Sequence, residues 1–134
     1  MEAYRTQLVG NGHDQSELKV NINVPIHLSD TEKTARTGFT KTINNYLETL
    51  RDIGRSQGTS RGSSRADNLD ADAVMDEFAA VGTPDQVSEK LNKFKEMYRP
   101  QEFMCWFNIG GMLTHAEVER SMRLFAEEVM PRFR

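Results

Sequence analysis

Two adjacent glycines, Gly110 and Gly111, stand just before a predicted helix and offer the clearest opportunity for chemistry in the sequence. Glycine lets the backbone approach a ligand closely, and exposed N–H groups at a helix start can hold an anion. The alternative is structural, since a tight turn between a strand and a helix needs positive φ angles whatever it binds. Thr114 is predicted to form a capping box with Glu117, which favours a structural role for its hydroxyl. The sequence contains no G-x-G-x-x-G motif, P-loop or nucleophile elbow.

Apolar side chains flank this turn. Met104, Trp106 and Met112 could form the wall of a substrate pocket, and core packing is the alternative role for the first two. Cys105, in the same apolar run, is interpreted as a small buried hydrophobe rather than a nucleophile.

The spacing of residues gives little support for an acid–base catalytic site or for a metal site. The carboxylates do not form a catalytic pair, and His13, His27 and His115 are widely spaced around a single cysteine. One cysteine excludes an internal disulfide, and these spacings do not match a Cys/His metal cluster. We therefore assign neither a catalytic residue nor a metal ligand.

Composition narrows the class of protein. The chain has 134 residues and a net charge of -3, with a pI near 5.6 and a mean hydropathy of -0.63. This acidic balance argues against general nucleic-acid or anionic-membrane binding. No stretch is long enough to span a membrane, and the amino terminus lacks the apolar core of a signal peptide, so we expect a cytoplasmic protein.

The segment Lys19 to Leu28 is predicted to be a strand because apolar and polar residues alternate through it. Its apolar face carries Val20, Ile22, Val24, Ile26 and Leu28, and its other face carries Asn21, Asn23, Pro25 and His27. Pro25 cannot donate a hydrogen bond to a neighbouring strand, which favours an edge or a strand end. A second strand is predicted at Phe103 to Phe107, parallel and adjacent to the first, because a strand–helix–strand connection brings its strands into one sheet.

Helices are predicted around these strands. Ser29 to Glu32 reads as a capping box before a long amphipathic helix that reaches Ile53, and Thr83 to Gln86 opens another that ends before Pro100. A short helix is predicted from about Asp70 to Ala80, and a final one from Thr114 to Pro131. The glycine- and serine-rich segment 54–68 is predicted to be a mobile loop.

The sequence from Gly110 to Phe133 resembles the carboxyl end of luciferase-like, flavin-dependent monooxygenases. It reads Gly-Gly-Met-Leu-Thr-His-Ala-Glu-Val-Glu-Arg-Ser-Met-Arg-Leu-Phe-Ala-Glu-Glu-Val-Met-Pro-Arg-Phe. Val81 to Gln86 is similar to the family's helix-opening signature, and Ser16 to Thr31 to a penultimate strand and turn. The resemblance implies an α/β fold, helix-rich with a small parallel sheet, forming the last two βα units of a TIM barrel in one domain over residues 1–134.

In such a barrel the carboxyl ends of the strands form the catalytic face. The resemblance therefore implies that His27 and the turn Asn108 to Met112 line that face, and that Asn21 and Asn23 point with His27 into the lumen. The implied cofactor is FMN or a deazaflavin. Its candidate contacts are Asn21, Asn23, His27, Asn108, Gly110 and Gly111, and the candidate substrate contacts are Trp106 and Met112.

A complete TIM barrel usually needs roughly 250 residues. We therefore expect a truncated or carboxyl-terminal segment of such a monooxygenase, inactive alone, whose parent activity would use a flavin reductase. The alternative is a non-catalytic α/β binding or assembly module derived from the family. Since a sheet of two strands leaves its edges unpaired, we also expect a homodimer or a complementary barrel half. The predicted contact surfaces are Phe39, Ile43, Leu47 and Phe125.

Overall fold

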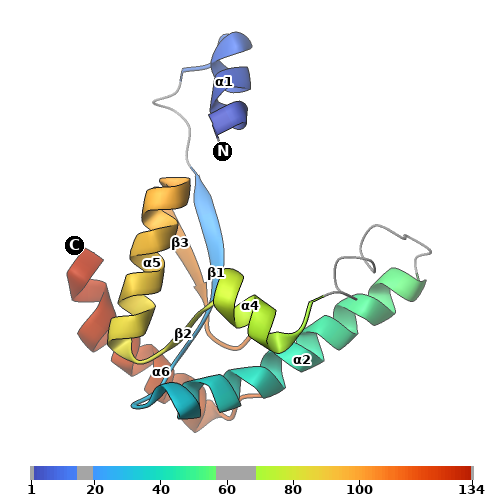
Figure 1. Cartoon of the computed structure of the whole chain (residues 1–134), viewed down its shortest axis with the longest axis vertical. Coiled ribbons are helices and arrows are strands. Elements are labelled where there is room, and N and C mark those ends of the chain that lie inside the picture. Colours follow the sequence, from blue (N-terminus) through green and yellow to red (C-terminus); the bar gives the residue numbers. More distant parts are fainter. Residues whose placement is uncertain (1, 15–19, 57–68, 134) are drawn as a thin grey trace.

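A parallel sheet of three strands lies at the centre of the residues that the computed structural model describes, which are 2–14, 20–56 and 69–133 (Figure 1). β1 (Asn21–Leu28) is the middle strand, between β2 (Ala80–Gly82) and β3 (Glu102–Trp106). Val24 lies opposite Cys105, and His27 lies opposite Val81. The α/β class, the small parallel sheet and the adjacency of the two predicted strands are confirmed.

The apolar face of β1 packs on the second half of the chain. Val24, Ile26 and Leu28 are almost fully buried against α5 (Pro84–Tyr98) and the carboxyl-terminal helical segment. That segment consists of α6 (His115–Leu124), the π-helical turn η2 (Phe125–Val129) and the 3₁₀ turn η3 (Met130–Phe133). This face of the sheet carries one of the two hydrophobic clusters.

The second cluster lies on the opposite face, beneath α2 (Glu32–Ser56) and α4 (Ala71–Glu77) (Figure 1). The apolar stripe of α2, formed by Phe39, Ile43 and Leu47, is buried there within the chain. These three side chains are therefore not available as the self-association surface predicted from the sequence. The expectation that the polar face of β1 borders an open lumen is also wrong at its carboxyl end, which α2 covers.

The strand that sequence reasoning missed, β2, accounts for this arrangement. The connection from β1 to β2 runs toward one edge of the sheet, and the connection from β2 to β3 runs back across β1. Right-handed crossovers that run in opposite directions place their helices on opposite faces. The helices of a TIM barrel, in contrast, form a single outer ring.

Several predicted boundaries shift. The cap of α2 is Thr31, whose Oγ1 accepts a hydrogen bond from Thr34 N at 3.2 Å, and not Ser29. The final helix changes to π and 3₁₀ turns after Leu124, which places Pro131 outside the regular α-helix that its ring would disrupt. Of the predicted loop 54–68, residues 54–56 form the end of α2, and residues 57–68 lie outside the described residues.

The first helix, α1 (Glu2–Gly10), stands away from the sheet (Figure 1). Gly10 is still helical, and the positive φ of 82° after this helix occurs at Gly12. The predicted capping boxes at the starts of α5 and α6 are both present.

Candidate functional site

The turn after β3, where the candidate flavin contacts gather, is bound by helix α2. Thr42 Oγ1 donates to the carbonyl oxygen of Ile109, and Asn45 Nδ2 donates to that of Gly110 at 2.7 Å. Gly110 has a φ of 80°, and a Cβ there would lie 1.9 Å from the carbonyl oxygen of Thr42. The absence of a side chain at Gly110 therefore allows a close approach of α2.

The start of α6 is occupied by its own capping box. The backbone N–H and the hydroxyl of Thr114 donate to the Glu117 carboxylate at 2.8 and 2.7 Å, and Glu117 N donates back to Thr114 Oγ1 at 3.3 Å. Hydrogen bonds from the side chain and then the backbone of Thr114 lower the pKa of Glu117. A carboxylate thus stands where an anion would bind, and the phosphate of FMN does not fit this helix start.

Asn108 and Gly111 differ in their surroundings. Asn108 Oδ1 accepts a hydrogen bond from Leu113 N at 3.2 Å, which closes the turn. Gly111 has a φ of 72° and open space where a Cβ would stand. A role for either residue in flavin binding stays a prediction.

His27 lies near this turn, but it is buried. Its residue exposure is 4 %, and a Cβ at Gly38 of α2 would come within 2.9 Å of His27 Nε2. Its Nδ1 has no hydrogen-bond partner among the described residues. Burial lowers the pKa of His27, and the charge of Glu117 opposes this shift. The structure therefore places His27 at the predicted edge of the sheet, beneath α2.

Asn21 and Asn23 are exposed on the part of the same face that α2 leaves open. A shallow cavity of about 340 Å³ is lined by Asn23, Met104, Cys105 and Trp106. Met104 is 62 % exposed, so the core-packing alternative does not hold for it, and the ring of Trp106 meets that of Tyr46 edge-on at 5.7 Å.

The candidate residues thus fall into two groups. The asparagines of β1 and Trp106 lie on the open face, whereas His27, Asn108 and Gly110 lie beside or beneath α2. Met112, a candidate substrate contact, is 55 % exposed at the end of the turn. The described residues do not form a site that fits complete FMN, because the phosphate position is filled, and we derive no chemical step through a flavin.

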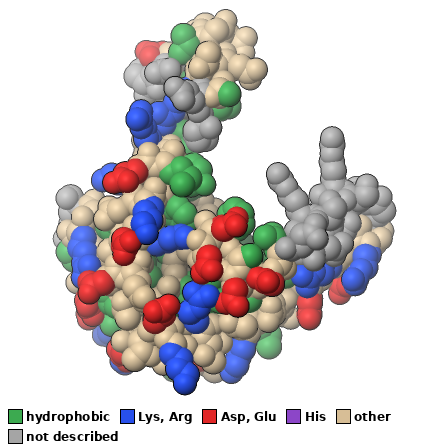
Figure 2. Space-filling view, viewed as in Figure 1, with side chains coloured by type: hydrophobic (Ala, Val, Ile, Leu, Met, Phe, Trp, Pro, Cys, Tyr) green, Lys and Arg blue, Asp and Glu red, His purple; other side chains and the backbone are tan. Residues whose placement is uncertain are grey.

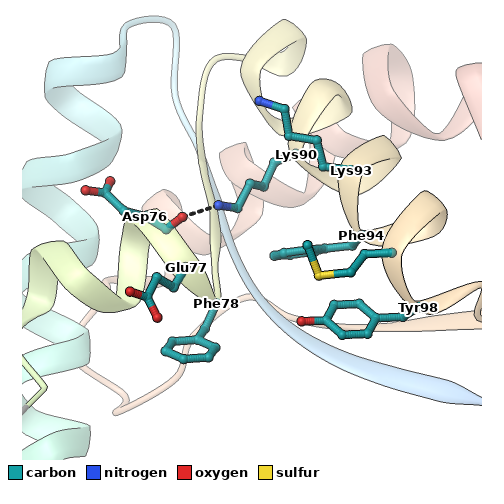
Figure 3. A pocket seen from close by; sticks show the side chains of 8 residues that line it. Asp76, Glu77, Phe78, Lys90, Lys93, Phe94 and Tyr98 are labelled. Carbon is teal, nitrogen blue, oxygen red and sulfur yellow. Dashed lines mark hydrogen bonds between the residues drawn. The ribbon is translucent and has the colours of Figure 1, made fainter. Parts of the chain in front are cut away.

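A cavity that sequence reasoning missed lies between α4 and α5, and we call it the α4–α5 groove (Figure 3). It has a volume of about 330 Å³, and its lining residues are Asp76, Glu77, Phe78, Lys90, Lys93, Phe94, Met97 and Tyr98. Phe94 and Tyr98 belong to α5, and Phe78 stands opposite them at the end of α4, a position that periodicity did not mark.

Acidic and basic side chains are mixed on the surface, and the described residues contain no candidate metal site. Figure 2 shows acidic and basic side chains intermingled over the visible face of the body. Within the described part of the chain, no group of three or more His, Cys, Asp or Glu residues could hold a metal ion. Among the described helices, none combines the length and apolar character needed to cross a membrane.

This α/β architecture is similar to that of solved flavin-dependent monooxygenases. One is the oxygenating constituent of 3,6-diketocamphane monooxygenase from Pseudomonas putida in complex with FMN, with 24 % identity and a TM-score of 0.66 over 98 % of this chain. Another is the monooxygenase RslO1 from Streptomyces bottropensis, with 21 % identity and a TM-score of 0.63 over 99 % of this chain. A riboflavin lyase with modified FMN and riboflavin matches at 15 % identity and a TM-score of 0.57 over 98 %.

The family is established by sequence. A model of the luciferase-like monooxygenases matches residues 1–99, and the chain belongs to that family. The segment on which the resemblance is most specific, Phe103 to Phe133, lies beyond the matched residues. No curated protein sequence matches the chain at a significant level. The chain spans only 38, 36 and 34 % of the three solved structures, so the likeness concerns about a third of each.

Proposed function

We propose that this chain is a carboxyl-terminal segment of a luciferase-like, flavin-dependent monooxygenase, an oxidoreductase whose parent activity oxidises a small organic substrate in the cytoplasm. The observation that carries the proposal is the coverage, which includes nearly all of this chain but about a third of each monooxygenase. The segment by itself does not turn over substrate, because the groups near the turn bind α2 and because a flavin on the shallow open face would remain exposed to water.

The cofactor of the parent activity is proposed to be FMN or a deazaflavin, on the strength of the family and of the FMN-bound relative. In such enzymes the flavin supplies the oxidation chemistry, and the protein supplies placement and exclusion of water. Of the candidate flavin contacts, Asn23 lines the open cavity described above.

A flavin titration tests this proposal. We expect no stoichiometric FMN binding at micromolar protein, because the phosphate has no free position at the start of α6, and no NADH-driven oxidation after a flavin reductase is added. A complete luciferase-like monooxygenase, assayed in parallel, serves as the control for reductase and cofactor. Tight stoichiometric FMN binding by this chain, followed by turnover, would contradict the proposal.

A second candidate function is a non-catalytic binding or assembly module on the family scaffold. The α4–α5 groove favours it, since its main cavity is lined by none of the candidate flavin contacts and exposes the apolar side chains of Phe78 and Met97.

Self-association also stays a prediction, with a revised surface. β3 is an edge strand among the described elements, and Met104 and Trp106 are exposed beside that edge. Two copies that pair their β3 strands about a two-fold axis would each cover the β3 edge of the other copy. Light scattering at micromolar concentration is expected to give the mass of a dimer; a 15.3 kDa species would show that the chain remains a monomer.

A further inference from the structure

One edge of the central strand is unpaired over about half of its length among the described residues. β2 pairs with Ile26 to Leu28, so the edge from Asn21 to Val24 has no described neighbour on that side. An unpaired edge presents a row of backbone N–H and C=O groups and is a template for pairing with another strand.

The hydrogen bonds at the two ends of β1 show which backbone groups face this edge. Ser29 N donates to the carbonyl oxygen of Gly82 on the β2 side, and Val20 O accepts from Gln101 N on the β3 side. Since successive residues of a strand direct their backbone groups to alternate sides, Asn21 and Asn23 face the free edge with both N–H and C=O. Pro25 adds nothing to the free edge, because it has no N–H and because its carbonyl oxygen faces Ala80 in the pairing of Ile26 with Ala80.

This edge forms the floor of the α4–α5 groove. A cavity of about 150 Å³ is lined by Ile22, Asn23, Val24 and Pro25, and it shares Glu77, Phe78, Phe94 and Tyr98 with the larger cavity above it. Figure 3 shows Phe78 on one wall and the rings of Phe94 and Tyr98 on the other, with β1 passing between them. Phe78 is 49 % exposed, which leaves apolar surface for an occupant.

Three of the four charged side chains on the walls have a partner within the described residues. Asp76 pairs with Arg36 at 3.2 Å, and Lys93 pairs with Glu89 at 2.7 Å. The ammonium group of Lys90 donates to the backbone carbonyl of Asp76 and lies 5.3 Å from the centroid of the Phe94 ring. Glu77 makes no ion pair or hydrogen bond with the described part of the chain, so its carboxylate is available to pair with a positively charged side chain of an occupant.

We propose that the α4–α5 groove binds an extended peptide segment of a partner protein, which adds a strand to the free edge of β1 at Asn21 to Val24. Backbone hydrogen bonds to Asn21 and Asn23 align the segment, and alternate apolar side chains lie between Phe78 and the rings of α5. A lysine or arginine of the segment pairs with Glu77. This inference does not rest on flavin binding: the segment bonds the backbone groups of Asn21 and Asn23, whereas a flavin would contact their side chains.

The test uses the complete chain and a defined probe, the acetylated and amidated peptide Val-Lys-Val-Lys-Val. At saturating peptide we expect hydrogen exchange of the Asn21 and Asn23 amides to slow at least about tenfold, because these amides become bonded. The amides of Ile22 and Val24, which face β3 in the free protein, are expected to change little. Unchanged exchange at Asn21 and Asn23 would overturn the proposal.

Two further comparisons separate strand addition from general adhesion. A peptide that is methylated on the backbone nitrogen of all five residues keeps its side chains but has lost those N–H donors on both edges, so it should bind much more weakly. Binding equal to that of the unmethylated peptide would overturn the proposal. Glu77→Gln is expected to weaken binding several-fold, whereas Glu128→Gln, at another exposed carboxylate, should have no effect. Protection of Asn21 and Asn23 by self-association without peptide would assign the edge to a second copy and also refute the proposal.

Discussion

Replacing Gly110 with alanine is expected to lower the free energy of unfolding by about 3 kcal/mol or more. The φ of 80° at this position costs a residue with a side chain about 1–2 kcal/mol. The new Cβ would also stand 1.9 Å from the carbonyl oxygen of Thr42, a backbone atom that can move only if α2 shifts, and overpacking of this kind costs about 1–3 kcal/mol. Urea unfolding monitored by circular dichroism measures the change.

Gly111→Ala is the matched control. Gly111 has a similar φ of 72° but no heavy atom within 4 Å of the position of a Cβ. It should lose only the backbone contribution, about 1–2 kcal/mol. Equal losses in the two variants would show that α2 does not press on the turn, and would remove the main argument against a ligand at Gly110.

The stability of the protein is expected to fall as the pH drops below about 6.5, the ordinary pKa of histidine, because His27 is buried as a neutral imidazole. Above this pH the imidazole is neutral in both the folded and the unfolded chain. Below it, the unfolded chain binds a proton that the folded chain resists, so the free energy of unfolding decreases until the pH reaches the lowered pKa of the folded state. Urea titrations between about pH 7.5 and 5.5 cover this window without reaching the range in which carboxylates protonate.

His27→Gln should flatten this dependence, whatever its effect on stability at neutral pH. His115→Gln is the control, since the side chain of His115 is 95 % exposed. If the wild-type chain and His27→Gln lose stability in parallel between the two pH values, His27 is not the group that titrates.

Local patterns were sufficient to predict most of the elements. The alternation in β1 identified both its existence and its buried face, because a strand that is buried on one side repeats every two residues. The capping boxes at Thr83 and Thr114 identified the starts of α5 and α6, because each needs only residues that are close in sequence. The same argument misplaced the cap of α2 at Ser29, since Thr31 offers an equivalent hydroxyl two residues later.

β2 could not be recognised in the same way. Ala80 to Gly82 is too short to show a period, and it is built from residues with low or mixed preference for strands. Its pairing with β1 is fixed by contacts across more than fifty positions of sequence. Without β2, the face of the sheet on which α2 packs could not be deduced, because the stripe of Phe39, Ile43 and Leu47 shows only that α2 has an apolar face.

The candidate site was predictable in its location but not in its environment. Sequence reasoning placed His27 and the turn at Gly110 near the same edge of the sheet, and the structure agrees. The hydrogen bonds from Thr42 and Asn45 that occupy the turn join residues 67 and 65 positions apart, a separation at which no sequence pattern operates. The α4–α5 groove likewise depends on the relative positions of α4 and α5 in the folded chain, which local sequence patterns do not encode.

The position of β1 in the middle of the sheet has a consequence for synthesis on the ribosome. Of the three described strands the central one is synthesised first, and β3, with which it pairs over more residues, is complete only at Trp106. Val24, Ile26 and Leu28 therefore leave the ribosome long before the described elements that bury them. Because transiently exposed apolar strands promote aggregation, the nascent chain should depend on chaperones until its last helical segment has emerged. A ribosome stalled within α5 would hold the chain at its most aggregation-prone length.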